Sequence, residues 1–220
     1  QCRGGHQLRA LPGQRTAPGP ALQGLQTNRL GGDGSYNVGT GFDLLYNFTG
    51  NHYLDFKTAT TFDDRTDSDL IEQTLFRVNL LKRTSRGFYY NFSALRSGEL
   101  YLPEVGFNTR FDYSQFDLEL AYGYFSSVDS PIRIINPSLQ SSLILRNEDH
   151  SVETFQLVQP WQIELKNNSD IQITANLWYE DIRVPLFFSD NAFVNPGNYT
   201  FWGVEAEYGM PGSRQLRTAI

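Results

Sequence analysis

Hydrophobic and polar residues alternate along most of the chain from residue 36 onward. The first such run, from Tyr36 to Phe48, places an apolar or aromatic residue at nearly every second position, with mostly Asn, Gly and Asp between them. Alternation with a period of two is typical of a β-strand with one apolar and one polar face. The pattern recurs and predicts nine strands, at residues 36–48, 54–62, 74–80, 88–94, 107–114, 116–124, 151–165, 171–179 and 202–208.

The connections between these predicted strands alternate in length. Short links lie at residues 49–51, 83–86, 115 and 166–169, and long ones at residues 63–69, 96–106, 126–150 and 181–198. A meander through a membrane has this rhythm, because tight turns lie on one side and extended loops on the other. Strands of about ten residues, at roughly 3.3 Å per residue and a tilt near 40°, span the roughly 25 Å apolar band of such a barrel. The sequence therefore predicts an all-β antiparallel meander of about nine long strands that forms part of a transmembrane β-barrel.

The start of the chain has a different composition. Residues 1–30 are rich in Gly, Pro, Gln and Arg, and no acidic residue precedes Asp33. We predict an irregular or disordered tail over residues 1–30 and a β-barrel segment over residues 31–220. Nine is an odd number of strands and no closing strand follows residue 209, so we expect an incomplete segment with unpaired edges at residues 36–48 and 199–208.

Charge and aromatic content limit the possible partners. Lys and Arg number 18 against 24 Asp and Glu, and the formal net charge of −6 excludes the basic surface of a nucleic-acid-binding protein. Aromatic residues make up 14% of the chain, which favours strands and the aromatic belts found at membrane interfaces. We therefore expect a lipid bilayer as partner, and no nucleic acid.

Charged side chains occupy the strand faces opposite the aromatic residues, so in a barrel they point into the lumen. One hypothesis is a lumen that selects ions or small solutes with a preference for cations. The other is a structural network of charges and water that fills a closed interior. The residues expected to face the lumen are Asp43, Asp55, Lys57, Arg77, Asp117, Glu119, Glu164, Glu180, Glu205 and Glu207.

The sequence predicts no catalytic residue, no cofactor site and no metal site. His6, His52 and His150 are scattered, and none accompanies a Ser and an Asp in the arrangement of a catalytic triad. The acidic run from Asp63 to Asp69 lacks the central Gly and the distal Glu of an EF-hand loop, so we interpret it as a solvated loop.

One segment resembles a known family. Residues 102–113, LPEVGFNTRFDY, and more weakly Thr27–Arg29 with Tyr36–Asp43, resemble the C-terminal barrel region of uncharacterised Gram-negative surface proteins. The N-terminal part of those proteins, absent here, looks like a family 9 carbohydrate-binding module. The resemblance implies a bacterial outer-membrane location and a link to glycan handling. Its motif residues are Pro103, Glu104, Gly106, Phe107 and Arg110.

The function predicted from these observations is that of a membrane-embedded pore or surface scaffold. The first alternative is a soluble β-sandwich that binds carbohydrate, in which Trp161, Trp178 and Trp202 stack on sugars. The second is a barrel that carries a hydrolase, which the missing triad disfavours.

Overall fold

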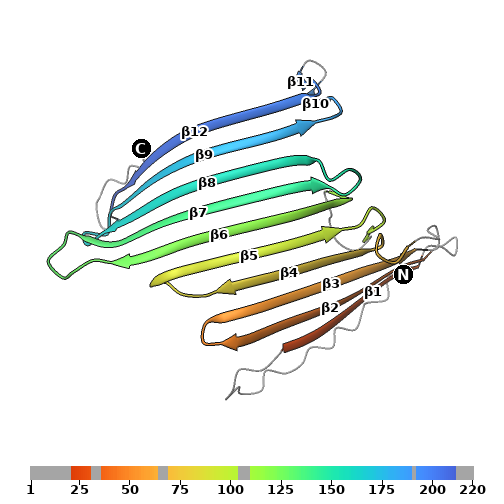
Figure 1. Cartoon of the computed structure of the whole chain (residues 1–220), viewed down its shortest axis with the longest axis horizontal. Helices are drawn as coiled ribbons and strands as arrows, with labels where there is room; N and C mark the ends of the chain where they lie inside the picture. The colour runs from red at the N-terminus through yellow and green to blue at the C-terminus, as the bar shows by residue number, and fades with distance from the viewer. Residues whose placement is uncertain (1–20, 31–35, 64–68, 104–109, 190–191, 212–220) are drawn as a thin grey trace. The chain divides into compact units, whose positions relative to one another are not determined.

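The computed structural model describes residues 21–30, 36–63, 69–103, 110–189 and 192–211, and every element in this part of the chain is a strand. Ten strands form one sheet in the order β1-β2-β3-β4-β5-β6-β7-β8-β9-β12, and β10 pairs with β11 in a separate hairpin (Figure 1). The strands are β1 (Ala21–Leu30), β2 (Tyr36–Thr49), β3 (His52–Asp63), β4 (Thr74–Lys82), β5 (Gly87–Ser97), β6 (Tyr113–Phe125), β7 (Ile132–Arg146), β8 (Val152–Leu165), β9 (Asp170–Ile182), β10 (Leu186–Ser189), β11 (Ala192–Val194) and β12 (Gly197–Gly209).

The chain divides into two compact units. The first unit comprises Gln1–Leu80, Ser93–Gln115 and Arg146–His150, and the second comprises Leu81–Phe92, Phe116–Leu145 and Ser151–Ile220. Strands β1 to β3 belong to the first unit, and β8, β9 and β12 belong to the second.

The predicted all-β antiparallel meander is confirmed. Eight of the nine predicted strands correspond to β2 to β6, β8, β9 and β12. The strand predicted at residues 107–114 is wrong for residues 110–112, which belong to no strand, whereas Tyr113 and Ser114 are the first residues of β6. Asp112 has a φ of 54°, a left-handed conformation that a strand cannot contain.

The long loop predicted at residues 126–150 is also wrong, because it contains strand β7. Pro137 and the polar residues around it interrupt the alternation in this stretch, and a proline argues against a central strand. The apolar ends of β7 pair nonetheless with apolar residues of β8, as Leu143 does with Phe155 and Ile135 with Ile163. Cross-strand packing at both ends therefore outweighs the weak central pattern.

Part of the predicted tail is a strand as well. Strand β1 pairs with β2 over its whole length, from Ala21 opposite Leu45 to Leu30 opposite Tyr36. The irregular tail is therefore wrong for residues 21–30, and so is the unpaired edge predicted at residues 36–48. Main-chain pairing with an open strand edge needs no side-chain alternation, which is why periodicity did not indicate β1. Residues 1–20 lie outside the described residues.

Successive connections lie at opposite ends of the strands. Residues 50–51, 83–86, 126–131 and 166–169 are short turns, and we call their end of each strand the short-turn end. At the other end, the long-loop end, residues 64–73, 98–112 and 183–196 form long connections, whereas residues 147–151 form a short one. Short and long connections alternate apart from this last loop, but the short link predicted at residue 115 is wrong, because Gln115 lies inside β6.

The strand register separates an apolar face from a polar face. Between β9 and β12, apolar residues lie opposite apolar residues, in the pairs Trp202–Leu177, Val204–Ala175, Ala206–Ile173 and Tyr208–Ile171. The intervening positions form the other face, in the pairs Gly203–Asn176, Glu205–Thr174 and Glu207–Gln172. Strands β2 and β3 show the same separation, because Leu44 lies opposite Phe56 and Asp43 lies opposite Lys57.

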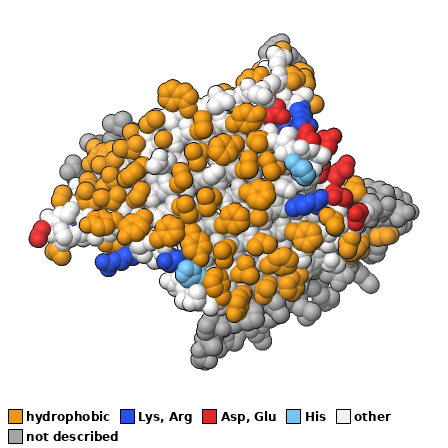
Figure 2. Space-filling model, viewed as in Figure 1, with side chains coloured by type: hydrophobic (Ala, Val, Ile, Leu, Met, Phe, Trp, Pro, Cys, Tyr) orange, Lys and Arg blue, Asp and Glu red, His pale blue; other side chains and the backbone are white. Residues whose placement is uncertain are grey.

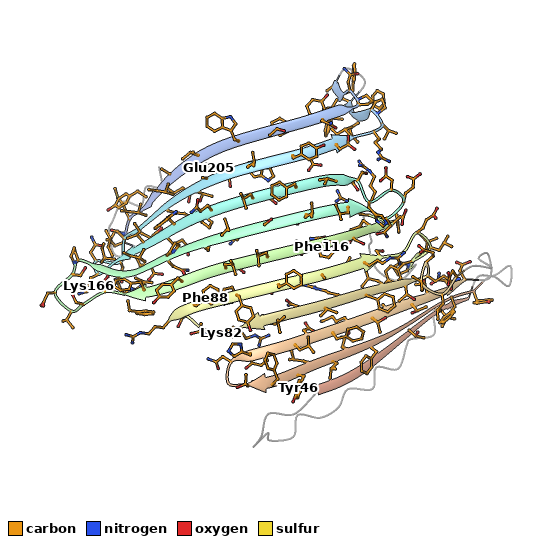
Figure 3. The ribbon with its side chains drawn as sticks, viewed as in Figure 1. Tyr46, Lys82, Phe88, Phe116, Lys166 and Glu205 are labelled. Carbon is orange, nitrogen blue, oxygen red and sulfur yellow. The ribbon has the colours of Figure 1, made fainter. Side chains whose placement is uncertain are left out.

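Burial is the reverse of that in a soluble core. In the described part of the chain, Leu81 is the single buried hydrophobic residue. The buried polar residues are Asn37, Thr61, Asp63, Gln73, Thr74, Ser93, Ser97, Ser169, Thr174 and Asn176. Large hydrophobic side chains are widely exposed, Trp202 by 80%, and Figure 2 shows them spread over the strands with charged side chains near the strand ends. Three of the exposed residues, Tyr46, Phe88 and Phe116, are labelled in Figure 3.

Candidate functional site: the polar face of the sheet

Two predicted lumen residues of the second unit take part in cross-strand side-chain hydrogen bonds, a set that we call the polar network. Ser142 Oγ on β7 donates to Asp117 Oδ1 on β6 at 2.7 Å. Glu119 accepts two hydrogen bonds, from Tyr89 Oη on β5 at 3.1 Å and from Gln140 Nε2 on β7 at 3.4 Å. Side chains from three strands therefore hold two carboxylates on the same face.

The network continues across β8, β9 and β12, where polar side chains bond to their neighbours in the strand register. Three hydrogen bonds connect these strands: Thr154 Oγ1 to Glu180 Oε2 at 2.9 Å, Gln162 Nε2 to Gln172 Oε1 at 3.3 Å, and Asn176 Nδ2 to Glu205 Oε1 at 3.4 Å. The predicted lumen residues Glu180 and Glu205 thus face the same side as their polar neighbours.

Three cavities of the second unit are lined largely by these polar side chains. Their volumes are about 310, 300 and 330 Å³. The second is lined by Asn91, Asp117, Glu119 and Gln140, among others, and the buried Oδ1 of Asn91 has no hydrogen-bond partner. Each of these cavities on the polar face therefore has room for several water molecules and is bordered by hydrogen-bond acceptors.

Carboxylates dominate the charge of this face. In the described part of the second unit the predicted lumen residues are Asp117, Glu119, Glu164, Glu180, Glu205 and Glu207. Arg133 is a basic residue that reaches them, through a salt bridge with Glu164. An excess of carboxylates in a confined space raises the local concentration of cations.

The predicted lumen residues of the first unit make shorter-range interactions. Lys57 Nζ lies 3.9 Å from Asp55 Oδ2 on the same strand, and Asp43 is its register partner on β2. Arg77 Nε donates to Ser93 Oγ at 3.3 Å. Both signs of charge are present here, so the acidic bias belongs to the second unit.

At the long-loop end of the first unit, residues 98–103 lie over the polar face of β2 and β3. Asn37 Nδ2 donates to the carbonyl oxygen of Leu102 at 3.0 Å and to Asp63 Oδ2 at 3.2 Å. The amide of Leu102 donates to Thr61 Oγ1 at 3.1 Å. Asn37 and Thr61 are 5% and 2% exposed, so residues 98–103 form a packed cover over the strand ends.

An ion pair and a glycine hold the cover in place. Arg96 Nη2 lies 2.6 Å from Glu72 Oε1, and the amide of Glu99 donates to Glu72 Oε2 at 3.1 Å. The hydrogen bond from Arg96 and that from the Glu99 amide keep the pKa of Glu72 below its usual value. A Cβ at Gly98 would overlap the backbone of Glu72, so only glycine fits there. The sequence did not indicate this cluster, because Glu72 lies on the loop between β3 and β4 whereas Arg96 lies near the end of β5.

The residues of the resemblance motif are only partly described. Pro103 follows Leu102 in the segment that covers β2 and β3, and the Arg110 guanidinium lies 5.9 Å from the ring centroid of Tyr113. Glu104, Gly106 and Phe107 lie outside the described residues.

The other residues considered from the sequence do not converge. Trp161 and Trp202 lie on the apolar face, whereas Trp178 lies on the polar face opposite Gln156 and Phe201. The three tryptophans therefore cannot form one stacking platform on this sheet. The His52 ring lies 5.8 Å from the ring of Phe48, and His6 lies outside the described residues.

The described residues contain no group of three or more His, Cys, Asp or Glu side chains that could hold a metal ion. They also contain no helix that is long and apolar enough to cross a membrane. Comparisons with protein-family models, curated proteins and solved structures find no match.

Proposed function

We propose that this chain is a segment of a bacterial outer-membrane β-barrel that acts as a pore or surface scaffold. Its apolar face meets the acyl chains, and its polar face borders a water-filled interior. The reversed burial supports this most strongly, because large aromatic residues are exposed while Asn37, Thr61 and Thr174 are buried. Outward apolar and inward polar alternation is the arrangement of membrane barrels.

Strand length and connectivity support the same proposal. Strands β2, β6, β8, β9 and β12 have 13 or 14 residues each, well above the five or six usual in soluble sheets. At about 3.3 Å per residue, 13 residues extend roughly 43 Å. At a tilt near 40° such a strand is longer than the apolar band of about 25 Å, so its ends reach the polar regions on both sides.

The soluble carbohydrate-binding sandwich is the weaker proposal. A sandwich buries one face of each sheet against the other, so it needs a second sheet over the apolar face. The strands of the described part form one large sheet and one small hairpin, and Trp202 and Val204 are exposed by 80% and 66%.

The acidic polar face of the second unit favours an interior that admits cations over one that serves only as a structural network. Asp117 and Glu119 border a cavity of about 300 Å³. An excess of carboxylates beside this space raises the local concentration of cations.

Folding in buffer and in detergent tests the membrane assignment. The full chain should aggregate in plain buffer and acquire strand circular dichroism in detergent micelles or lipid vesicles, because the apolar face needs an apolar solvent. A monodisperse monomer that unfolds cooperatively in plain buffer would contradict the proposal and favour the sandwich.

A further inference from the structure

We propose that the polar face of β9 and β12 binds an organic cation of the quaternary ammonium class, in a gap over Gly203 between Phe201 and Glu205. This names a solute class for the interior, so it rests on the proposed function.

Aromatic side chains gather at this place on the face where carboxylates are expected. Phe201 lies on β12 with Tyr199 two residues before it, and the two rings are parallel within 5° with centroids 6.4 Å apart. Trp178 on β9 is the register partner of Phe201 and points to the same face. Phe201 is 54% exposed, so its ring is available to a solute.

A glycine leaves space beside these rings. Gly203 is the next residue after Phe201 on the same face, and a Cβ added there would meet no atom within 4 Å. Glu205 follows on the far side of the gap, where Asn176 Nδ2 donates to its Oε1 at 3.4 Å. Phe201 and Glu205 are four residues apart, or roughly 13 Å along an extended strand, which leaves room for one small substituted ammonium group.

Phe201 on one side of the gap and Glu205 on the other both attract a positive charge. An aromatic ring face attracts a cation within about 6 Å of its centroid, and a carboxylate attracts it by direct charge. Two more carboxylates lie on this face, those of Glu180 opposite Tyr199 and of Glu207 opposite Gln172. Figure 3 labels Glu205 on β12.

The chemistry of the gap favours a methylated ammonium group over a metal ion or a neutral sugar. The phenyl ring of Phe201 has no hydrogen-bonding atom, and one oxygen of Glu205 already accepts from Asn176. A weakly hydrated cation can use ring faces and a single carboxylate, which is how aromatic cages recognise quaternary ammonium groups. A neutral sugar can donate hydrogen bonds to the surrounding carboxylates, but it gains no charge attraction from them.

A pair of isosteric probes tests this site in the full chain folded in detergent. Choline and 3,3-dimethyl-1-butanol have nearly the same shape, but only choline is charged. Isothermal titration calorimetry should detect binding of choline and about tenfold weaker or no binding of the neutral alcohol. Equal affinity for the two, or no choline binding, would overturn the inference.

Matched variants locate the site. Phe201→Leu and Glu205→Gln should each weaken choline binding about tenfold. Trp202→Leu, which changes the adjacent aromatic residue on the apolar face, should leave it unchanged. Gly203→Leu should abolish binding by filling the gap, and circular dichroism checks that each variant folds. Unchanged affinity in Phe201→Leu and Glu205→Gln, or binding of a neutral sugar that depends on Phe201, would overturn the assignment.

Failure of the ammonium-site proposal is distinguishable from failure of the proposed function. If the chain folds only in detergent or lipid but does not bind choline, only the ammonium site is contradicted. If the chain folds as a monomer in plain buffer, the membrane proposal is contradicted, whatever the chain binds.

Discussion

Gly123 on β6 is a residue whose identity the backbone dictates. A Cβ at this position would overlap the carbonyl oxygen of Ser85, which belongs to the turn between β4 and β5. The Arg86 guanidinium lies 5.7 Å from the ring centroid of Phe125 in the same region. The turn therefore packs against β6 at the short-turn end, and the missing side chain of Gly123 makes room for it.

We expect Gly123→Ala to destabilise the detergent-folded chain by about 1–3 kcal/mol, because the backbone must shift to admit the methyl group. Gly203→Ala is the matched control, because a Cβ at Gly203 meets open space. Thermal unfolding followed by circular dichroism measures both variants. Equal stability of the two would mean that the turn does not contact Gly123.

The Glu72–Arg96 pair makes the long-loop cover sensitive to acid. The pKa of Glu72 is lowered in the folded chain, so its contribution to stability is present above its ordinary value of 4.5 and is lost as the pH falls through the folded-state pKa. Both side chains are about one-third exposed, and the pair should contribute less than about 1 kcal/mol.

The measurement is amide hydrogen exchange at Gly98 and Leu100, whose amides donate to the carbonyl oxygens of Thr74 and Glu72. Protection should fall below pH 4.5 in the natural chain, whereas Glu72→Gln should show weaker protection without this pH dependence. Glu99→Gln, which removes a carboxylate from the same segment, serves as the control. The same acid response in all three chains would show that Glu72 is not its source.

At the scale of elements, periodicity was sufficient where apolar residues recur without interruption. Strand β6 was predicted almost to its ends, because Phe116, Leu118, Leu120, Tyr122 and Tyr124 are uninterrupted. Strand β7 was not predicted because Pro137 and a polar run interrupt the alternation at its centre. Strand β1 was not predicted because its sequence does not alternate, although its main chain pairs with β2. The alternation of apolar and polar residues therefore predicts only those strands in which one face is continuously apolar.

The residues of the candidate site, like the strands, were predictable from the sequence only in part. Alternation alone places Asp117, Glu119 and Glu205 on polar faces, where each accepts a hydrogen bond from a polar neighbour. The cover at residues 98–103 and the gap at Gly203 were not predictable, because both depend on which residues of different strands lie opposite each other. Register is fixed by long-range pairing, which one sequence does not reveal.

Two adjacent residues of β6, Leu120 and Glu119, lie on opposite faces of the sheet. Leu120 belongs to the apolar face and Glu119 to the polar network. In lipid, Leu120→Arg should destabilise the chain by about 2–4 kcal/mol, because it places a cation among acyl chains, whereas Glu119→Arg should cost much less. Chemical denaturation of the two variants in vesicles provides the comparison. Equal losses would indicate that both faces meet the same environment.

At the scale of the whole molecule, the acidic polar face should distinguish ions by their charge. Trp178 reports on this face when Trp161 and Trp202 are replaced by Phe. In vesicles, the ratio of caesium quenching to iodide quenching should be higher for Trp178 than for free N-acetyltryptophanamide, because the nearby carboxylates attract cations. Glu180→Gln with Glu205→Gln should reduce this ratio. A ratio equal to or below that of free N-acetyltryptophanamide would contradict a cation-favouring interior.

The most direct test of the central claim is to locate the two faces of β6 in a bilayer. In a chain with Trp161, Trp178 and Trp202 replaced by Phe, a single tryptophan is introduced as Leu120→Trp or as Glu119→Trp, and quenching by brominated acyl chains is measured in vesicles. The proposed barrel predicts strong quenching of the tryptophan at position 120 and little at position 119, because only the apolar face meets lipid. Equal quenching at the two positions, or none at either, would contradict the membrane assignment.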